Sequence, residues 1–261
     1  VLFRSYCTLE PCAHHGRTGP CTERIIAAGI RRVVAAIEDP FPLVRGRGFA
    51  ALRARGIDVS EGVEREAAVR VNQPFLTSVR EGRPFVIVKA AVSAEGCIAA
   101  APGVRTPLTS AAANRDVQFL RASVDAVAVG AHTVLVDDPV LTVRDVYRER
   151  PLTRVVFDRR LTTSPTARVF GTLDTGPVIV VTTSAAAADR AAAREALERA
   201  GATVVRAPDG SLASALRTLV DHAVQSVLVE GGAAIHAAAW EEQVVDYVRV
   251  RSEEHTSELQ S

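Results

Sequence analysis

The segment from Thr8 to Cys21 holds the residues whose types and spacing are best suited to chemistry. Cys12 and Cys21 each follow a proline, and a loop with glycines and two histidines separates them. Thiolates placed in this way are typical of zinc ligands, and a hydrolytic zinc also needs a third protein ligand, a water and a carboxylate that moves protons. No histidine precedes Cys12, and Glu10 is the nearest carboxylate in the sequence. The pattern therefore predicts two zinc ligands out of three.

A second group of candidates lies further along the chain. Lys89 is the single lysine among 31 basic residues, and it follows the apolar run 85–88. Lysine offers a compact ammonium whose pKa can be tuned, and strand ends often carry ligand-binding residues. The alternative is that Lys89 occurs by chance in a sequence whose basic residues are otherwise all arginine. Gly231 and Gly232 lie between an apolar run and a helical segment, where backbone amides can approach a phosphate, although such a pair is often only a turn.

Composition limits the classes of function. The chain is 48% hydrophobic and has a net charge of +1 without runs of like charge, which does not indicate a nucleic-acid surface. The apolar stretches have the length of strands, which argues against a membrane span. Four cysteines, two of them in the metal-like pair, favour a reducing, cytoplasmic compartment.

Both ends of the chain suggest a foreign origin. The sequence lacks methionine, and residues 1–5 can be encoded by DNA whose reverse complement encodes residues 251–255. This DNA is similar to a sequencing-library adapter. We therefore expect residues 1–5 and 251–261 to be artefacts and the protein to be an internal fragment, roughly 6–250.

Alternating strand and helix signals predict parallel sheets covered by helices. A first unit is expected to have strands at 32–37 and 57–59, helices at 25–28, 49–55 and 64–71, and a connection at 72–83. From residue 84, apolar runs without strict alternation indicate strands that are buried on both faces. These strands are expected at 85–92, 126–129, 153–158, 178–182, 203–206, 226–230 and 244–250. The accompanying helices are expected at 110–122, 185–200, 212–222 and 233–240. The acidic segment Asp137–Pro139 and Arg144 are placed on a loop, where a simple turn and solvated charge are the alternatives.

The motif 8–21, followed by Ala27-Ala28-Gly29 and by Asp39-Pro40 through Gly46-Arg47-Gly48, resembles the bifunctional deaminase/reductase family of bacterial riboflavin biosynthesis. The resemblance extends over 6–250. It implies a truncated cytidine-deaminase-like α/β/α domain at 6–76 and a dihydrofolate-reductase-like α/β domain at 84–250.

For the first domain, the resemblance implies zinc-dependent deamination of a phosphoribosylaminopyrimidine. Cys12 and Cys21 correspond to two of three Zn²⁺ ligands, while the histidine ligand and the catalytic glutamate would precede Tyr6. His14, His15 and Arg17 fall where the loop can meet substrate; hydrogen bonding within the loop is an equal alternative for the histidines. We expect this chain to hold no stoichiometric catalytic zinc.

For the second domain, the resemblance implies NADPH-dependent reduction of the ribosyl side chain to ribityl. Lys89 and Glu230 take the catalytic positions. The implied substrate-binding residues are Thr109, Arg121, Leu141 and Arg144. The implied cofactor-binding residues are Ala91, Thr133, Asp137, Gly231, Gly232 and Ala233. The resemblance also implies a small-molecule substrate and a homo-oligomer formed through this domain.

The sequence departs from the family pattern at Arg105, Pro107 and Arg159, where serine, tryptophan and serine are usual, so cofactor preference is left open. Two alternatives remain. The chain can be a stand-alone pyrimidine reductase with a structural deaminase remnant, or a non-enzymatic nucleotide-binding module.

Overall fold

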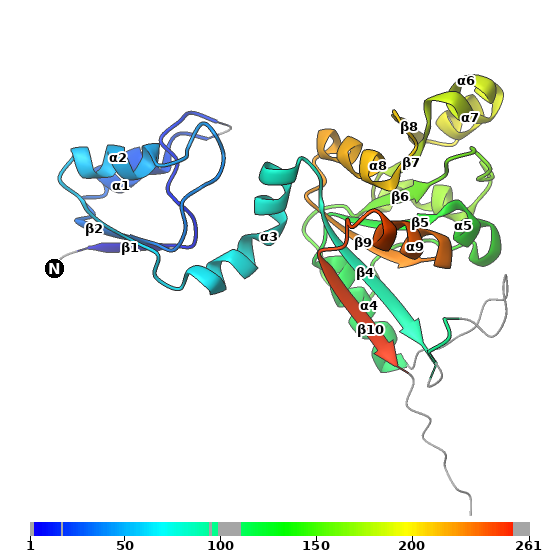
Figure 1. Cartoon of the computed structure of the whole chain (residues 1–261), viewed down its shortest axis with the longest axis horizontal. Helices are drawn as coiled ribbons and strands as arrows, with labels where there is room; N and C mark the ends of the chain where they lie inside the picture. Colours follow the sequence, from blue (N-terminus) through cyan, green and yellow to red (C-terminus); the bar gives the residue numbers. More distant parts are fainter. Residues whose placement is uncertain (1–2, 17, 94–95, 99–110, 253–261) are drawn as a thin grey trace, which may run out of the picture. The chain divides into compact units, whose positions relative to one another are not determined.

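The computed structural model describes residues 3–16, 18–93, 96–98 and 111–252 (Figure 1). The chain divides into two compact units, Val1–Gly82 and Arg83–Ser261. The domain limits 6–76 and 84–250 stay a prediction. The sequence-based assignments for Arg17, Arg105, Pro107 and Thr109 lie outside the described residues.

The first unit has a parallel sheet of three strands in the order β1-β2-β3. The buried residues Ile25, Val33, Leu52 and Ile57 form a cluster through which α1 and α2 pack on this sheet. The elements are β1 (Arg4–Cys7), α1 (Cys21–Ala27), β2 (Arg32–Ala35), α2 (Arg47–Ala54), β3 (Asp58–Glu61) and α3 (Arg65–Glu81).

The predicted connection at 72–83 is wrong, because α3 continues as a helix from Arg65 to Glu81 with Pro74 inside it. A proline inside a helix removes a backbone donor and clashes with the preceding turn. Ala68 and Leu76, on either side of this proline, are both buried in one cluster with Ile37. Tertiary packing of that face therefore outweighs the local cost of the proline.

The second unit is built on a parallel sheet of seven strands, in the order β10-β4-β9-β5-β6-β7-β8 (Figure 1). The predicted α/β class with a parallel sheet is thus confirmed for this part of the chain. The strands are β4 (Phe85–Val92), β5 (Ala126–Gly130), β6 (Thr153–Phe157), β7 (Val178–Thr183), β8 (Ala202–Ala207), β9 (Ser226–Gly231) and β10 (Tyr247–Ser252). The helices are α4 (Ala111–Ala122), α5 (Ala131–Asp137), η1 (Arg168–Thr175), α6 (Ser184–Asp189), α7 (Ala191–Arg199), α8 (Leu212–Thr218), η2 (Leu219–His222) and α9 (Ala233–Glu241).

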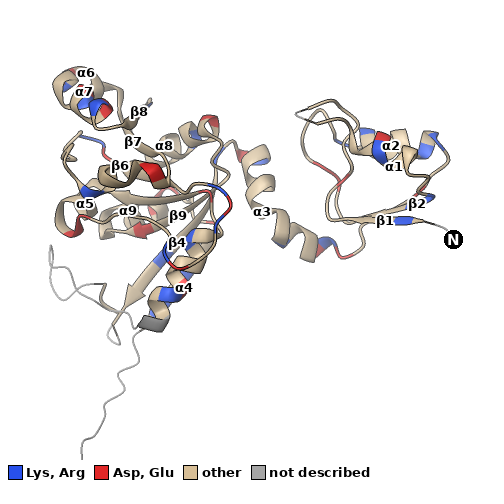
Figure 2. Ribbon diagram, turned by 180° about the vertical axis from the view of Figure 1, so that it is seen from behind, with Lys and Arg blue, Asp and Glu red and all other residues tan. Residues whose placement is uncertain are grey.

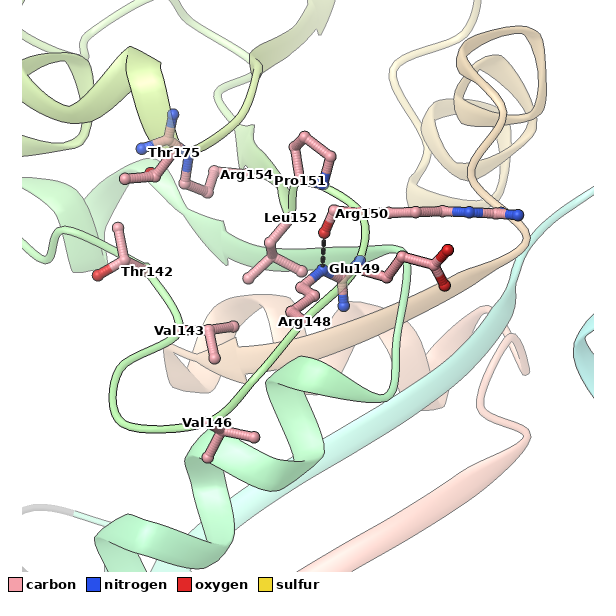
Figure 3. Close-up of a pocket in the computed structure, with 10 residues that line it drawn as sticks. All are labelled: Thr142, Val143, Val146, Arg148, Glu149, Arg150, Pro151, Leu152, Arg154 and Thr175. Carbon is pink, nitrogen blue, oxygen red and sulfur yellow. Dashed lines mark hydrogen bonds between the residues drawn. The ribbon is translucent and has the colours of Figure 1, made fainter.

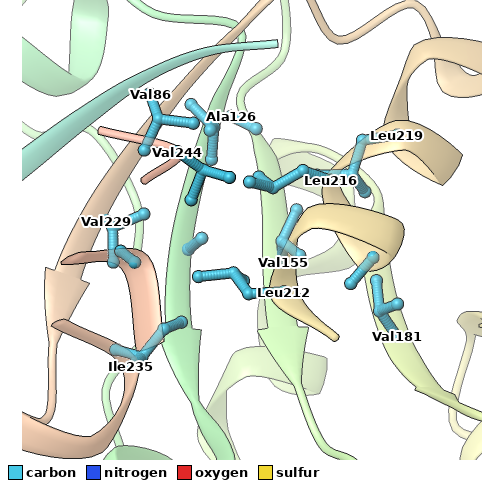
Figure 4. Packing of buried hydrophobic residues seen from close by; sticks show 14 of the residues in the cluster. Val86, Ala126, Val155, Val181, Leu212, Leu216, Leu219, Val229, Ile235 and Val244 are labelled. Carbon is cyan, nitrogen blue, oxygen red and sulfur yellow. The ribbon is translucent and has the colours of Figure 1, made fainter. Parts of the chain in front are cut away.

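Alternate residues of each central strand enter two separate cores, as expected for a sheet that is covered on both faces. In β5, Ala126 and Ala128 belong to the core beneath α8 and α9, which Figure 4 shows. Val127 and Val129 belong to the opposite core, which includes Leu197 of α7. The continuous apolar runs in the sequence result from this double burial.

Other local predictions also differ from the structure. The strand expected at 244–250 begins only at Tyr247, because Val244 is buried in the core before β10 starts. The helix expected at 185–200 is interrupted at Arg190, whose φ of −118° and ψ of 46° separate α6 from α7. Asp137 is the last residue of α5 and not a loop residue, because Val134 buries one face of that helix in the core. The 3₁₀ helix η1 was not expected at all.

Residues at both ends of the described chain take part in strands. Arg4 and Ser5 pair with Arg32 and Val33, while the edge strand β10 pairs with β4 as far as Ser252. Backbone pairing of this kind accommodates many sequences, and the adapter origin of residues 1–5 and 251–261 stays a prediction.

Acidic and basic residues are interspersed over the helices and strands, which fits the small net charge (Figure 2). Of the helices that the structure describes, none combines the length and apolarity needed to cross a bilayer.

Candidate functional site

A cavity of about 500 Å³ lies at the carboxyl end of the central strands of the second unit. Open parallel sheets bind their ligands at this end. The cavity is lined by Lys89, Arg121, Val129, Thr133, Asp137, Pro139, Val140, Leu141, Thr142, Arg144, Arg168 and Glu230. Seven residues that the sequence predicted to meet substrate or cofactor are thus brought together, although their roles stay predictions.

The sheet register explains why Lys89 and Glu230 share this cavity. The last residues paired between β4 and β9 are Val88 and Val229, and Lys89 and Glu230 follow them directly. Val88 and Val229 face the core beneath α8 and α9. Because side chains alternate along a strand, Lys89 and Glu230 face the opposite side, toward α4.

Arg121 and Glu230 form a buried bidentate ion pair. Arg121 Nε donates to Oε1 of Glu230 at 2.6 Å, and Nη2 donates to Oε2 at 2.7 Å. Only 13% and 9% of the two side chains are exposed. Burial by itself would lower the pKa of Arg121, but the hydrogen bonds and the charge of Glu230 outweigh burial and raise it. Removing one partner of such a pair leaves an uncompensated buried charge and costs about 3–5 kcal/mol.

A neighbouring cavity of about 340 Å³ is lined by Arg148 and nine other residues (Figure 3). Arg148 crosses this cavity, and its Nη1 donates to the carbonyl oxygens of Arg121 and Ala122 at 3.0 and 2.8 Å. These carbonyls belong to the last turn of α4, where a cation also interacts favourably with the helix dipole. Arg148 therefore caps the helix that carries Arg121.

The loop that follows α5 brings hydrophobic and basic groups to the cavity under backbone strain. Asp138, Leu141 and Asp145 have φ angles of 39°, 58° and 58°. This left-handed region is unfavourable for a residue as bulky as leucine, which nevertheless is buried here. Strain of this type persists only where the surroundings enforce it, and it is common at ligand sites.

Of the residues predicted to contact the cofactor, Thr133 and Asp137 line the cavity, and Gly231 and Gly232 lie against Thr133. A Cβ on Gly231 would come within 3.0 Å of the Thr133 side chain. Gly232 has a φ of 88°, which favours glycine. Ala233 begins α9, so this glycine pair leaves backbone amides open at a helix N-terminus. Ala91 lies on β4 opposite Arg251 and is not among the lining residues.

Sequence reasoning missed two residues near this site. Arg168, at the start of η1, lines the cavity, and no local motif marked it. His236 lies on α9, where its imidazole contacts the backbone of Val229. Burial lowers the pKa of His236, and the positive charge of Lys89 lowers it further. Its Nε2 is buried and has no hydrogen-bond partner among the described residues.

In the first unit, the predicted metal ligands are close to each other. The Cys21 amide donates to Cys12 Sγ at 3.4 Å. Burial raises the pKa of the Cys21 thiol, and the hydrogen bond with Cys12 raises it further. The His14 ring lies 6.0 Å from that of Phe41, measured between centroids, whereas His15 is exposed. Within the described ranges, no three His, Cys, Asp or Glu residues are grouped so that they could hold a metal ion.

Glu10 is held by four backbone amides. Its side chain is 3% exposed. It accepts backbone hydrogen bonds from Asp39 and Gly46 at Oε2 and from Gly48 and Phe49 at Oε1, at 2.8–3.2 Å. Gly48 is required at this contact, because a Cβ there would lie 1.8 Å from the carbonyl oxygen of Pro11. Glu10 thus ties the cysteine segment to the Pro- and Gly-rich loop before α2.

These features define the class of protein. A parallel sheet with a basic cavity at its carboxyl end and a glycine pair before α9 makes the second unit an α/β domain whose cavity lies where open sheets bind ligands. Residues 84–252 match the RibD C-terminal domain family. The chain belongs to the RibD family.

Relatives over nearly the whole chain agree with this assignment. The chain is 39% identical to the riboflavin biosynthesis protein RibD of Bacillus amyloliquefaciens over 89% of its own length and 62% of that protein. The RibD protein of Aquifex aeolicus is 38% identical, with 87% and 62% coverage. The chain therefore spans about three fifths of these relatives.

Solved structures show the same similarity. RibD of Acinetobacter baumannii has a TM-score of 0.82 and 34% identity, covering 94% of this chain and 67% of that protein. A diaminohydroxyphosphoribosylaminopyrimidine deaminase/5-amino-6-(5-phosphoribosylamino)uracil reductase of Thermotoga maritima has a TM-score of 0.78 and 37% identity, with 92% and 64% coverage.

Replacing Glu10 with Gln tests its role in the first unit. We expect a loss of about 2–4 kcal/mol in the free energy of unfolding, because one acceptor oxygen is replaced by an amide that faces backbone donors. Urea denaturation of both variants measures the effect, with the exposed Glu23→Gln, expected within about 0.5 kcal/mol, as control. Equal stability of the two variants would show that Glu10 does not organise the loop.

The half-buried imidazole of His236 predicts a pH dependence of stability. Because its folded pKa is lowered, the unfolded chain binds the proton more readily, and stability is lost as the pH falls below about 6.5. The slope is at most about 1.4 kcal/mol per pH unit, less any screening by solvent. Thermal unfolding between about pH 7 and 5 should show a shallower loss for His236→Gln than for the exposed control His132→Gln. Identical slopes would contradict a lowered pKa of His236 in the folded chain.

Proposed function

We propose that the second unit is an NADPH-dependent reductase of riboflavin biosynthesis. Its substrate is a phosphoribosylaminopyrimidine, and the reaction converts the ribosyl side chain into ribityl. The observation that carries this proposal is the placement of Lys89 and Glu230 side by side in a cavity that also holds Arg121 and Arg144. The name of the Thermotoga maritima relative, which includes the uracil reductase activity, supports it.

The ion pair suggests distinct roles for the two central side chains. Arg121 holds the carboxylate of Glu230 in one position through two hydrogen bonds, and the remaining lone pairs of Glu230 can accept hydrogen bonds from hydroxyl groups of the sugar. Lys89 carries three donors and no acceptor. When the sugar ring opens, its ring oxygen needs a proton, and the Lys89 ammonium is the group that we assign to deliver it.

The residues beside the cavity fit a dinucleotide cofactor. The glycine pair at 231–232 packs against Thr133 and leaves the amides at the start of α9 available for a diphosphate. Bound NADPH supplies the hydride for the anomeric carbon, while the protein positions the reacting groups. Thr133 and Asp137 are the side chains we assign to its orientation.

The first unit does not fit a complete catalytic zinc site. Cys12 and Cys21 would supply two thiolates, but in the part of the chain that the structure describes no third ligand joins them. Glu10 is occupied by backbone amides and is not available to move protons. We therefore derive no deamination step for this chain. Formation of a homo-oligomer through the second unit is part of the proposal, and light scattering of the purified chain tests it.

Substitution of the two central residues tests the reductase. Glu230→Gln and Lys89→Ala should each lower kcat about 100-fold or more, since positioned proton-transfer groups contribute about 10²–10⁴-fold. Turnover is followed by the absorbance of NADPH with the phosphoribosylaminopyrimidine substrate. Glu195→Gln, on the exposed surface of α7, is the matched control and should keep full activity.

Two outcomes would count against this assignment. Unchanged turnover in Lys89→Ala would dismiss its part in proton delivery. Absence of NADPH binding by the unsubstituted chain would favour the non-enzymatic module.

A further inference from the structure

The cavity of the second unit has a surplus of positive charge. Lys89, Arg121, Arg144 and Arg168 are its basic residues, and Asp137 and Glu230 are its acidic ones, which gives four positive charges against two negative. A concave site with such a surplus attracts an anionic ligand. The question is which guanidinium groups are free to bind it.

All three nitrogens of the Arg121 guanidinium already donate hydrogen bonds within the protein, so an anion finds no unoccupied pair of donors. Its Nε and Nη2 are engaged by Glu230, and Nη1 donates to the carbonyl oxygen of Thr142 at 2.7 Å. An anion could reach this guanidinium bidentately only by displacing Glu230. That exchange would leave Glu230 as a buried charge without its partner, at a large cost in free energy.

Arg144 and Arg168 differ from Arg121 in burial and in partners. Both are exposed, and no carboxylate pairs with either guanidinium within the described ranges. Their backbones are nevertheless anchored. The Arg144 amide donates to Gln118 Oε1 at 2.9 Å, and the Arg168 amide donates to Asp138 Oδ1 at 2.8 Å. Two available guanidinium groups thus reach one cavity from anchored backbone positions.

We propose that Arg168 is a phosphate-binding residue of this cavity, acting together with Arg144, and that Arg121 is instead a positioning residue for Glu230. A guanidinium matches the geometry of a phosphate monoester and binds it through charge-assisted hydrogen bonds. The ribose 5-phosphate of the substrate and the 2′-phosphate of NADPH share this chemistry. The assignment to either source rests on the proposed reductase function, whereas the binding of phosphate itself does not.

Direct binding tests the anion site without any turnover. Calorimetric titration of the full chain with inorganic phosphate should give a Kd that rises about 10-fold in Arg168→Gln and in Arg144→Gln, as expected for the loss of one charge-assisted contact. Arg217→Gln removes an exposed charge of α8 outside the cavity and should bind as the unsubstituted chain does. Equal affinity of Arg168→Gln and Arg217→Gln would overturn the proposal.

Steady-state kinetics separate the two sources and the two kinds of arginine. If the substrate phosphate is bound, Arg168→Gln raises the KM for the phosphoribosyl substrate with little change in kcat. If the 2′-phosphate is bound, the same variant lowers the affinity for NADPH and leaves the affinity for NADH unchanged.

Arg121→Lys should instead lower kcat and alter the pH profile, because it disturbs Glu230. A normal pH profile together with a raised substrate KM in Arg121→Lys would refute the positioning role. A chain that binds phosphate but never oxidises NADPH would refute the reductase and leave the anion site intact.

Discussion

The arrangement of the cavity depends on the buried ion pair between Arg121 and Glu230. It joins α4 to β9 across 109 residues of sequence, with both oxygens of the carboxylate engaged. A pair buried to this degree is favourable only if its geometry satisfies the remaining donors, and the bond from Arg121 Nη1 to the carbonyl oxygen of Thr142 does so. Arg148 separately caps α4, the helix that carries Arg121. The bonds from Arg121 hold the Glu230 carboxylate in one position, so a structural interaction also determines which groups it can contact in the cavity.

The seven-stranded sheet supplies the second constraint. Lys89 and Glu230 are neighbours because β4 and β9 run in the same direction and share a register that ends one residue earlier. A shift of this register by one residue would turn one of the two side chains into the apolar core beneath α9. The buried valines on both faces of the sheet therefore fix the strand register, and this register places Lys89 and Glu230 in the cavity.

Much of the second unit could be predicted from the sequence, since strands buried on both faces produce long apolar runs and the helices between them are amphipathic. The errors share a cause, which is packing between distant segments. Pro74 lies inside α3 because Ala68 and Leu76 are buried together, and α5 exists because Val134 enters the core. Arg168 was not predicted for the same reason. Its place at the cavity depends on a hydrogen bond from its amide to Asp138, which lies thirty residues away in sequence.

The two units show why a motif and a site are different kinds of observation. The cysteine segment was the clearest sequence signal, yet Glu10, near its start, accepts hydrogen bonds from backbone amides of residues 39–49. In the second unit no single motif was as distinctive, and the candidate residues came from four separate segments that the fold brings together. Chemistry requires several groups around one point, and the residues of the second unit meet this requirement through their register, their ion pair and their surplus of positive charge.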